Sequence, residues 1–154
     1  MIEEIREDRA TEASLRWRAA YDLADAQLRI FKLRLYQFLL AMDNHANQMP
    51  KLKNPKSNEW NFHRNRKKIT PDEAQYARLK TAFGLKMNRE EYLAAQQKGE
   101  AEAIALLDEV IQSHPGTPWA RRAEEEKRLG IGFVVSDRLW DPSGVRRTIK
   151  VPKL

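Results

Sequence analysis

The first third of the chain carries an uninterrupted helical pattern. No glycine or proline occurs between Met1 and Met49, and apolar side chains recur there at alternating spacings of four and three residues. This spacing places them on one side of a helix. We therefore expect one long helix over about residues 3–47, with this stripe buried against the helices that follow. The stripe consists of Trp17, Tyr21, Ala24, Leu28, Phe31, Leu35, Phe38 and Met42.

A helix of this length would extend beyond a compact domain. At about 1.5 Å per residue, residues 3–47 would span about 65–70 Å, which exceeds the diameter of a domain of this size. Part of the helix must therefore project or pair with another chain, and homo-oligomerisation through the long helix is one expectation. The residues before Arg16 are mostly polar, so we expect them to be solvated or bound to a partner.

Capping signals predict three shorter helices. The first begins with a capping box formed by Thr70 and Glu73 and ends at Gly84. The second begins after Asn88, whose side chain suits the N-cap position. The third begins after a turn that contains Thr117. The expected helices cover residues 71–83, 89–112 and 118–129.

Two segments lack helical periodicity. Residues 50–69 are rich in asparagine and lysine, so we interpret them as a basic loop with a short ordered piece around Trp60. After Gly130 the pattern becomes extended, and residues 131–154 form either a small hairpin or an extended tail along the helices. Trp140 is the expected apolar anchor of either arrangement. The hairpin would join the extended runs 133–135 and 148–151.

These elements and the composition indicate a mainly α protein. The chain of 154 residues contains 42% hydrophobic and 32% charged residues and only 6 glycines, a balance typical of helical proteins with solvated faces. Its length suits a single helical domain, 1–154. In this domain the long helix would pack on a bundle of short helices, and the C-terminal tail would be extended.

The residues that usually catalyse reactions or bind metals form no recognisable pattern. The chain has no cysteine, which excludes disulfides and thiolate metal sites and leaves the redox compartment undetermined. The three histidines, His45, His63 and His114, lack the spacing that places two ligands on one helix face. Asp22 and Asp25 lie one turn apart, and we interpret them as ion-pair partners of nearby arginines. We expect no enzyme activity, no cofactor and no metal.

The chain shows no signal for a membrane. Residues 1–8 are acidic and lack the apolar core of a secretory signal peptide. The most apolar stretch, residues 28–42, is short and interrupted by charges. We expect a soluble chain without a transmembrane segment, and its location stays open.

Positive charge is concentrated in the basic loop. Residues 51–68 contain seven basic side chains and one acidic one, which equals the formal net charge of the whole chain, +6. In this run Trp60, Phe62 and His63 are interleaved with cations and asparagines, a mixture that suits nucleic acid because cations neutralise phosphates and aromatic rings stack on bases. An acidic protein surface is a second candidate partner. The third interpretation is a solvated loop whose aromatic residues pack on the long helix.

We expect the charges of this loop to bind a partner and to leave folding unaffected. The candidate partner-binding residues are Lys51, Lys53, Lys56, Trp60, Arg64, Arg66, Lys67 and Lys68.

The turn between the last two helices supplies one further candidate. Residues 101–111 and 119–129 are amphipathic, and the break at 114–118 separates them. Trp119 begins the second of these helices. It either folds back on Leu107 and Ile111, which would fix the angle of the hairpin, or contacts a partner as an interface residue.

Residues 99–130 resemble a tetratricopeptide-type helical hairpin. The turn contains proline, and Ala120 and Ala123 are the small residues that let the two helices of such a hairpin pack closely. The resemblance covers about one fifth of the chain and a single repeat. It implies a fold that mediates protein interactions.

A second resemblance spans most of the chain. The long helix, the basic linker, the helix start at 68–73, the turn at 114–120 and the ending at 149–154 are similar to the helical C-terminal region of some large bacterial von Willebrand factor A-domain proteins. These motifs are structural, and the Asp-x-Ser-x-Ser motif of the A domain does not occur in the chain. The resemblance therefore implies an accessory helical module and assigns no adhesion residues.

These patterns favour a non-enzymatic helical scaffold for protein–protein association, with a protein partner whose identity the sequence does not give. The alternative is a nucleic-acid-binding module that acts through residues 51–68, and an accessory subunit of an enzyme is a third candidate. The first two differ in salt dependence, because neutralising phosphates releases counterions and makes affinity fall steeply with salt.

Overall fold

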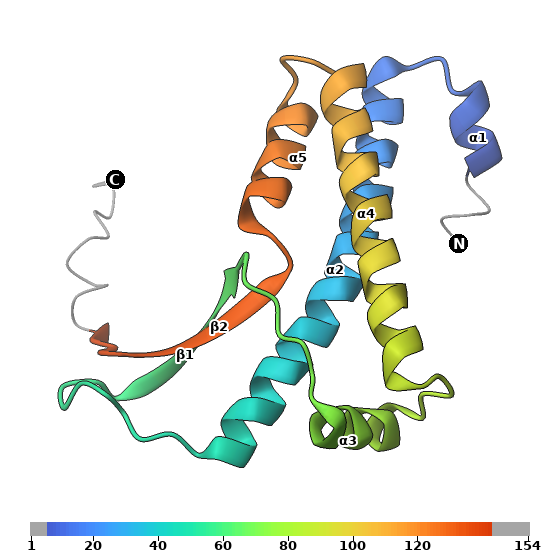
Figure 1. Ribbon diagram of the computed structural model, residues 1–154. Coiled ribbons are helices and arrows are strands. Elements are labelled where there is room, and N and C mark those ends of the chain that lie inside the picture. The colour runs from blue at the N-terminus through green and yellow to red at the C-terminus, as the bar shows by residue number, and fades with distance from the viewer. Residues whose placement is uncertain (1–5, 143–154) are drawn as a thin grey trace, which may run out of the picture.

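The computed structural model describes residues 6–142 and is mainly helical (Figure 1). Helices α2 and α4 lie side by side, α5 and α3 pack beside them, and a two-stranded sheet crosses the C-terminal half of α2. The elements are α1 (Arg6–Thr11), α2 (Leu15–Gln48), β1 (Glu59–Asn65), α3 (Glu73–Phe83), α4 (Arg89–Ser113), α5 (Pro118–Leu129) and β2 (Gly132–Arg138).

The single helix expected over residues 3–47 is wrong, because the chain breaks before Leu15. Ser14 caps α2 by accepting a hydrogen bond from the backbone N–H of Trp17 at 3.4 Å, and the Glu12 carboxylate accepts one from the Ser14 N–H at 2.7 Å. Serine favours such caps over helix interiors because its hydroxyl competes for backbone groups. The short α1 is held to α2 by an ion pair of 2.6 Å between Arg9 and Asp22.

The expected buried stripe of α2 is also wrong, because α2 buries its other side. Most of the expected stripe is exposed, including Trp17, Leu28 and Leu35. The buried stripe has the same four-three spacing but contains small residues, which let neighbouring helices approach closely. Its members are Ala19, Leu23, Ala26, Ile30, Leu33 and Leu40.

Two clusters of buried residues form the core. The larger one joins the middle of α2 to α4 and α5, where Ala123 and Leu107 are fully buried. The smaller one lies at the lower end of the molecule in Figure 1, where Leu40 of α2 meets Tyr76 of α3 and Tyr92 of α4. Packing α4 and α5 on α2 therefore leaves the opposite side of α2 without cover.

The caps of the shorter helices agree with the sequence except at α3. Asn88 and Glu91 form a capping box before α4, Thr117 caps α5, and Gly84 ends α3 in a left-handed conformation at φ 61°. The expected cap of α3 by Thr70 is wrong. Asp72 caps it instead by accepting a hydrogen bond from the N–H of Gln75, so that the helix begins at residue 73.

The basic loop and the extended tail pair with each other. Residues 50–69, which we expected to be a loop with a short ordered piece around Trp60, contain β1 at that place, and β2 from the tail pairs with it in antiparallel register from Glu59↔Arg138 to Asn65↔Gly132. Gly132 is required there, because a Cβ would lie 2.0 Å from the carbonyl oxygen of Lys67. The expected strand over 148–151 lies outside the described residues, and Trp140 is 44% exposed, so its ring is not a buried anchor.

A buried carboxylate connects α2, α5 and β1. Glu126 of α5 is fully buried and pairs with Arg34 of α2, with Arg122 one turn earlier at 2.7 Å, and with Arg64 of β1 at 3.7 Å. Gln27 donates a further hydrogen bond to it at 3.1 Å. Burial alone would raise the pKa of Glu126, but the hydrogen bonds and charges of these partners hold it below its ordinary value. The carboxylate is therefore ionised at neutral pH.

Arg34 also binds two backbone carbonyl groups at the end of α5. Its guanidinium donates to the carbonyl oxygen of Glu126 at 3.1 Å and to that of Gly130 at 2.9 Å. These carbonyls belong to the last turn of α5 and to its C-cap, where intrahelical partners run out. One buried side chain of α2 thus fixes the end of α5 and the start of the segment that leads into β2.

Replacing Glu126 by glutamine should strongly destabilise the fold. The variant Glu126→Gln keeps the size of the side chain but leaves the buried Arg34 without its counter-charge, so we expect the free energy of unfolding to fall by about 3–5 kcal/mol. Chemical denaturation measures it. The matched control is Glu124→Gln on the same helix, where the side chain is exposed and the change should stay within about 0.5 kcal/mol. Equal losses in both variants would contradict a special role for Glu126.

Candidate functional site

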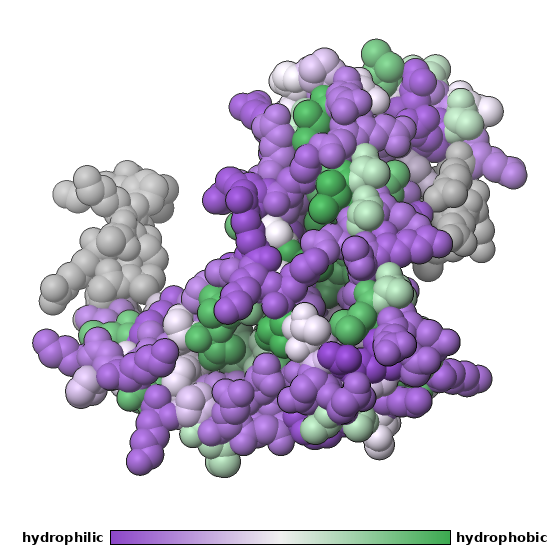
Figure 2. All heavy atoms as spheres, in the orientation of Figure 1, coloured by the Kyte–Doolittle hydropathy of each residue, from purple (hydrophilic) through white to green (hydrophobic). Residues whose placement is uncertain are grey.

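A groove lies between the C-terminal half of α2 and the sheet. It has a volume of about 450 Å³ and is lined by α2, by the loop before β1, by both strands and by the segment that follows β1. Apolar side chains gather around the crossing of α2 and the strands, within an otherwise mostly hydrophilic surface (Figure 2). The apolar lining includes Ala41, Trp60, Ile69, Phe133 and Val135.

Three lysines line the groove and no acidic residue does. These are Lys53, Lys67 and Lys68. Lys68 forms an ion pair with Glu100 of α4 at 2.5 Å, whereas Lys53 and Lys67 are exposed and form no ion pair with any other residue of the range 6–142. The groove therefore carries two cations whose charge is not neutralised by the fold.

Polar side chains of β2 and α2 hold the backbone of the two basic segments in place. The carboxylate of Asp137 accepts hydrogen bonds from the backbone N–H groups of Lys53 at 2.9 Å and Asn54 at 2.8 Å, and these bonds lower the pKa of Asp137. On the other side, the buried Gln37 of α2 accepts from the N–H of Ile69 at 2.7 Å and donates to its carbonyl oxygen at 3.1 Å. Both basic segments are thus tied to the sheet or to α2.

Four of the nine residues predicted from the sequence meet at this groove. Lys53, Trp60, Lys67 and Lys68 line it, while Lys51 and Lys56 lie in the exposed loop outside it. The remaining three, Arg64, Arg66 and Trp119, do not line it.

The two arginines and Lys68 take part in the fold, which corrects our expectation that these charges leave folding unaffected. Arg64 lies 3.7 Å from the buried carboxylate of Glu126, and Arg66 donates to the carbonyl oxygen of Arg128 at 2.9 Å. Lys68 pairs with α4 as described above. Reversing these three charges would therefore disturb contacts between elements as well as any binding.

The aromatic rings of β1 pack against α2. The ring of Trp60 meets His45 edge to face at 4.6 Å, and Phe62 meets Phe38 at 5.7 Å between centroids. Phe133 of β2 meets Phe38 as well, at 5.4 Å. Trp60 and Phe62 alternate with polar residues, and because alternate residues of a strand face the same side, Arg64 lies on the same side of β1 as these two rings.

Trp119 packs on the core. It is partly buried against the larger cluster, to which Leu107 belongs and on which Ile111 also packs. This is the arrangement in which the tryptophan fixes the hairpin of α4 and α5. Its surroundings give no separate evidence that it binds a partner.

Sequence reasoning missed the groove residues from distant elements. His45 of α2 and Phe133 of β2 line the groove with residues of the basic segment. No local motif marks either of them. Only the pairing of β1 with β2 and its crossing over α2 bring them together.

The acidic pairs named from the sequence are structural. Asp25 pairs with Arg29 at 3.1 Å, as expected, but Asp22 pairs with Arg9 and lies 3.3 Å from a ring nitrogen of His114. Between residues 6 and 142, no three His, Asp or Glu side chains come together as a metal site. Within the same residues, no helix is long and apolar enough to cross a membrane.

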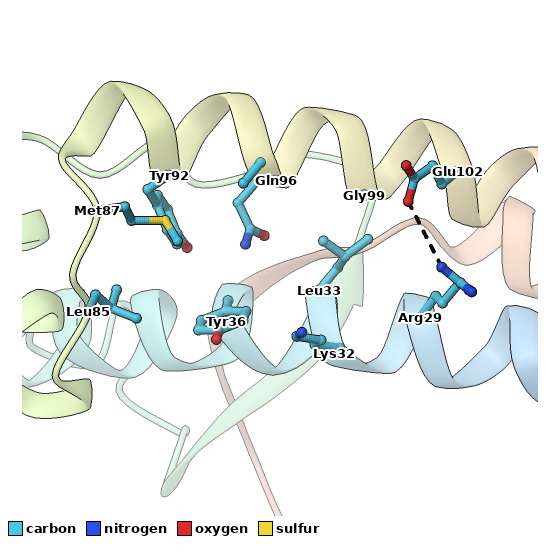
Figure 3. A pocket seen from close by; sticks show the side chains of 11 residues that line it. Arg29, Lys32, Leu33, Tyr36, Leu85, Met87, Tyr92, Gln96, Gly99 and Glu102 are labelled. Atoms are coloured by element: carbon cyan, nitrogen blue, oxygen red, sulfur yellow. Dashed lines mark ion pairs between the residues drawn. The ribbon is translucent and has the colours of Figure 1, made fainter. Parts of the chain in front are cut away.

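A second hollow, of about 280 Å³, lies between α2 and α4 (Figure 3). Tyr92 and Gln96 point into it from α4, opposite Tyr36 and Leu33 of α2. The Tyr92 hydroxyl and the Gln96 side-chain oxygen are buried without a hydrogen-bond partner among the described residues. Burial, with Tyr36 and Tyr76 nearby, raises the pKa of Tyr92 to about 12, so the hydroxyl keeps its proton at neutral pH. None of the residues predicted from the sequence lines this hollow.

Removing two neighbouring tyrosine hydroxyls should have different effects on stability. In Tyr92→Phe a buried hydroxyl without a partner is lost, so we expect the melting temperature to stay unchanged or rise. In the matched variant Tyr76→Phe, a hydrogen bond of 2.6 Å to the carbonyl oxygen of Met87 is lost, and we expect a decrease of roughly 2–4 °C. Thermal unfolding measures both, and a clear loss for Tyr92→Phe would mean that a water or ligand binds its hydroxyl.

Comparison with known proteins does not assign the chain to a family. No protein-family model, no curated protein and no solved structure matches it. The function proposed below therefore depends on the geometry and charge of the groove.

Proposed function

We propose that the chain is a non-enzymatic helical scaffold for protein–protein association, and that its groove binds an acidic segment of a partner protein. The observation that carries this proposal is the lining of the groove, where three lysines surround an apolar floor without an acidic residue. Carboxylates of a bound segment would meet Lys53 and Lys67, which have no ion-pair partner in residues 6–142.

The shape of the groove suits an extended peptide with mixed character. A volume of about 450 Å³ accommodates a few residues and not a folded surface. Its apolar floor at Phe133 and Ile69 would bury an aliphatic side chain, while the amides of Asn44 and Gln48 can pair with peptide groups. A segment that alternates acidic and aliphatic residues therefore matches both the charge and the floor.

The packing of the aromatic rings favours protein over nucleic acid. Proteins that bind single strands offer exposed ring faces on which bases stack. Here Trp60 is partly buried with its ring against His45, and Phe62 is held between Phe38 and His45. The rings therefore support the groove from below. Nucleic-acid binding through residues 51–68 stays the alternative, since the lysines would attract phosphates as well.

The proposal predicts that two lysines control binding without affecting the fold. We expect Lys53→Glu combined with Lys67→Glu to weaken binding of a labelled peptide of alternating glutamate and leucine by at least ~10-fold, because two attractive charges become repulsive. The unfolding midpoint should stay unchanged, since neither side chain forms an ion pair in residues 6–142. Fluorescence anisotropy and thermal unfolding measure the two effects.

The controls distinguish peptide binding in the groove from a general effect of net charge and from binding of nucleic acid. Lys80→Glu combined with Lys86→Glu makes the same change of net charge at exposed positions outside the groove, and this pair should leave peptide affinity nearly unchanged. Equal weakening by both pairs would reject the groove as the binding site. Tighter binding of a labelled oligothymidine than of the peptide, with a steep dependence on salt, would replace the proposal by the nucleic-acid alternative.

A further inference from the structure

The side of α2 that faces away from the core carries a row of exposed apolar residues. At about 100° per residue, Phe31 lies nearly opposite Leu33, and Leu33 is buried with a methyl group 3.4 Å from where a Cβ of Gly99 in α4 would lie. The helices α3, α4 and α5 and the strand β2 all contact α2 (Figure 1) and leave five large residues of this stripe exposed, while the rings of Phe62 and Phe133 pack on a sixth, Phe38. The five exposed residues are Trp17 at 67%, Leu28 at 52%, Phe31 at 44%, Leu35 at 56% and Met42 at 45%.

The size of the stripe is that of an interface. From Trp17 to Met42 it extends over about 38 Å of helix. Aromatic side chains offer roughly 150–250 Å² each, so two of them together with three aliphatic side chains, all about half exposed, leave on the order of 500 Å² uncovered. Burying this area on two copies removes about 1,000 Å² from water, which is the lower bound for a specific interface before flanking residues are counted.

We infer that α2 pairs with α2 of a second copy of this chain, in antiparallel orientation. A helix that covers the stripe must present apolar side chains at the same four-three spacing over the same length. Within residues 6–142 no helix other than α2 carries a series of exposed large apolar residues, because α3 and α4 have one each, Phe83 and Ile104. The second copy meets the requirement without any further partner.

The antiparallel arrangement matches the sizes of facing residues. With the two-fold axis between Leu28 and Phe31, Leu28 of one copy lies beside Phe31 of the second. The small Ala24 then lies beside Leu35, and the largest residue, Trp17, lies beside the flexible Met42 at the ends. Large residues thus meet smaller or adaptable ones, which favours close packing.

Charge and dipoles favour the same orientation. Lys32 flanks the stripe, is exposed and forms no ion pair with other residues of the described chain. In the antiparallel pair it lies on the same side as Asp25 of the second copy, which is 8% exposed and also pairs with Arg29, whereas in a parallel pair it lies beside Gln27. Antiparallel helices also place opposite ends of their dipoles together.

Sedimentation equilibrium of the chain across the micromolar range tests the pairing. We expect a dimer for the unaltered chain, and for Leu28→Glu combined with Leu35→Glu a dissociation constant at least ~100-fold higher, because carboxylates would be buried in an apolar seam. The unfolding midpoint measured under monomeric conditions should not fall, since both side chains are exposed in the single copy.

A matched control and the groove variants test whether the loss of dimerisation is specific to the stripe. Leu139→Glu changes an equally exposed leucine outside α2 and should leave the dimer intact, as should the paired lysine variants of the groove. Dimerisation therefore tests the stripe independently of peptide binding. A chain that is monomeric throughout this range, or a Leu28→Glu, Leu35→Glu variant that still dimerises, overturns the inference.

Cysteine crosslinking tests the orientation, because the chain has no cysteine of its own. Ala24→Cys combined with Leu35→Cys should form a disulfide-linked dimer under mild oxidation, while each single variant should not. The two positions are about 16 Å apart along one helix, too far for a bond within one chain. Efficient crosslinking by Ala24→Cys alone would show a parallel pair and overturn the antiparallel arrangement.

Discussion

Three arginines from α2, α5 and β1 lie around the buried carboxylate of Glu126, and most of the architecture depends on this contact. A single buried charge would be unstable, so α5 can dock only where Arg34 of α2 is available to pair with it. The same arginine binds the last carbonyls of α5 and thereby sets where the chain leaves towards β2. The position of the sheet across α2, and with it the groove, follows from this one pairing.

The helices could be predicted where local chemistry decides them. Asn88, Thr117 and Gly84 mark helix ends through groups within the same turn, and the structure confirms all three. The choice of the buried side of α2 could not be predicted, because two opposite stripes have the same spacing and only tertiary contacts distinguish them. We chose the stripe with the larger residues, whereas close packing of α4 and α5 requires the stripe with Ala19 and Ala26.

The candidate site likewise has one part that could be predicted from the sequence and one part that could not. Its lysines could be found from the sequence because they are concentrated in one segment, and Lys53, Lys67 and Lys68 do line the groove. The walls could not be found, because His45 and Phe133 come from elements that are far away in the chain. Strand β1 itself was not recognised, since its mixture of aromatic residues, asparagines and one arginine is equally typical of a binding loop until β2 is placed beside it.

The pairing of β1 with β2 also determines when the groove can form. Its register joins Glu59 to Arg138, so the sheet closes a long stretch of chain that contains α3, α4 and α5. Contacts between such distant residues form slowly, because the loop entropy must be lost before the contacts stabilise the chain. The helices are thus expected to assemble first, and during synthesis the groove is completed only after residue 138 has left the ribosome.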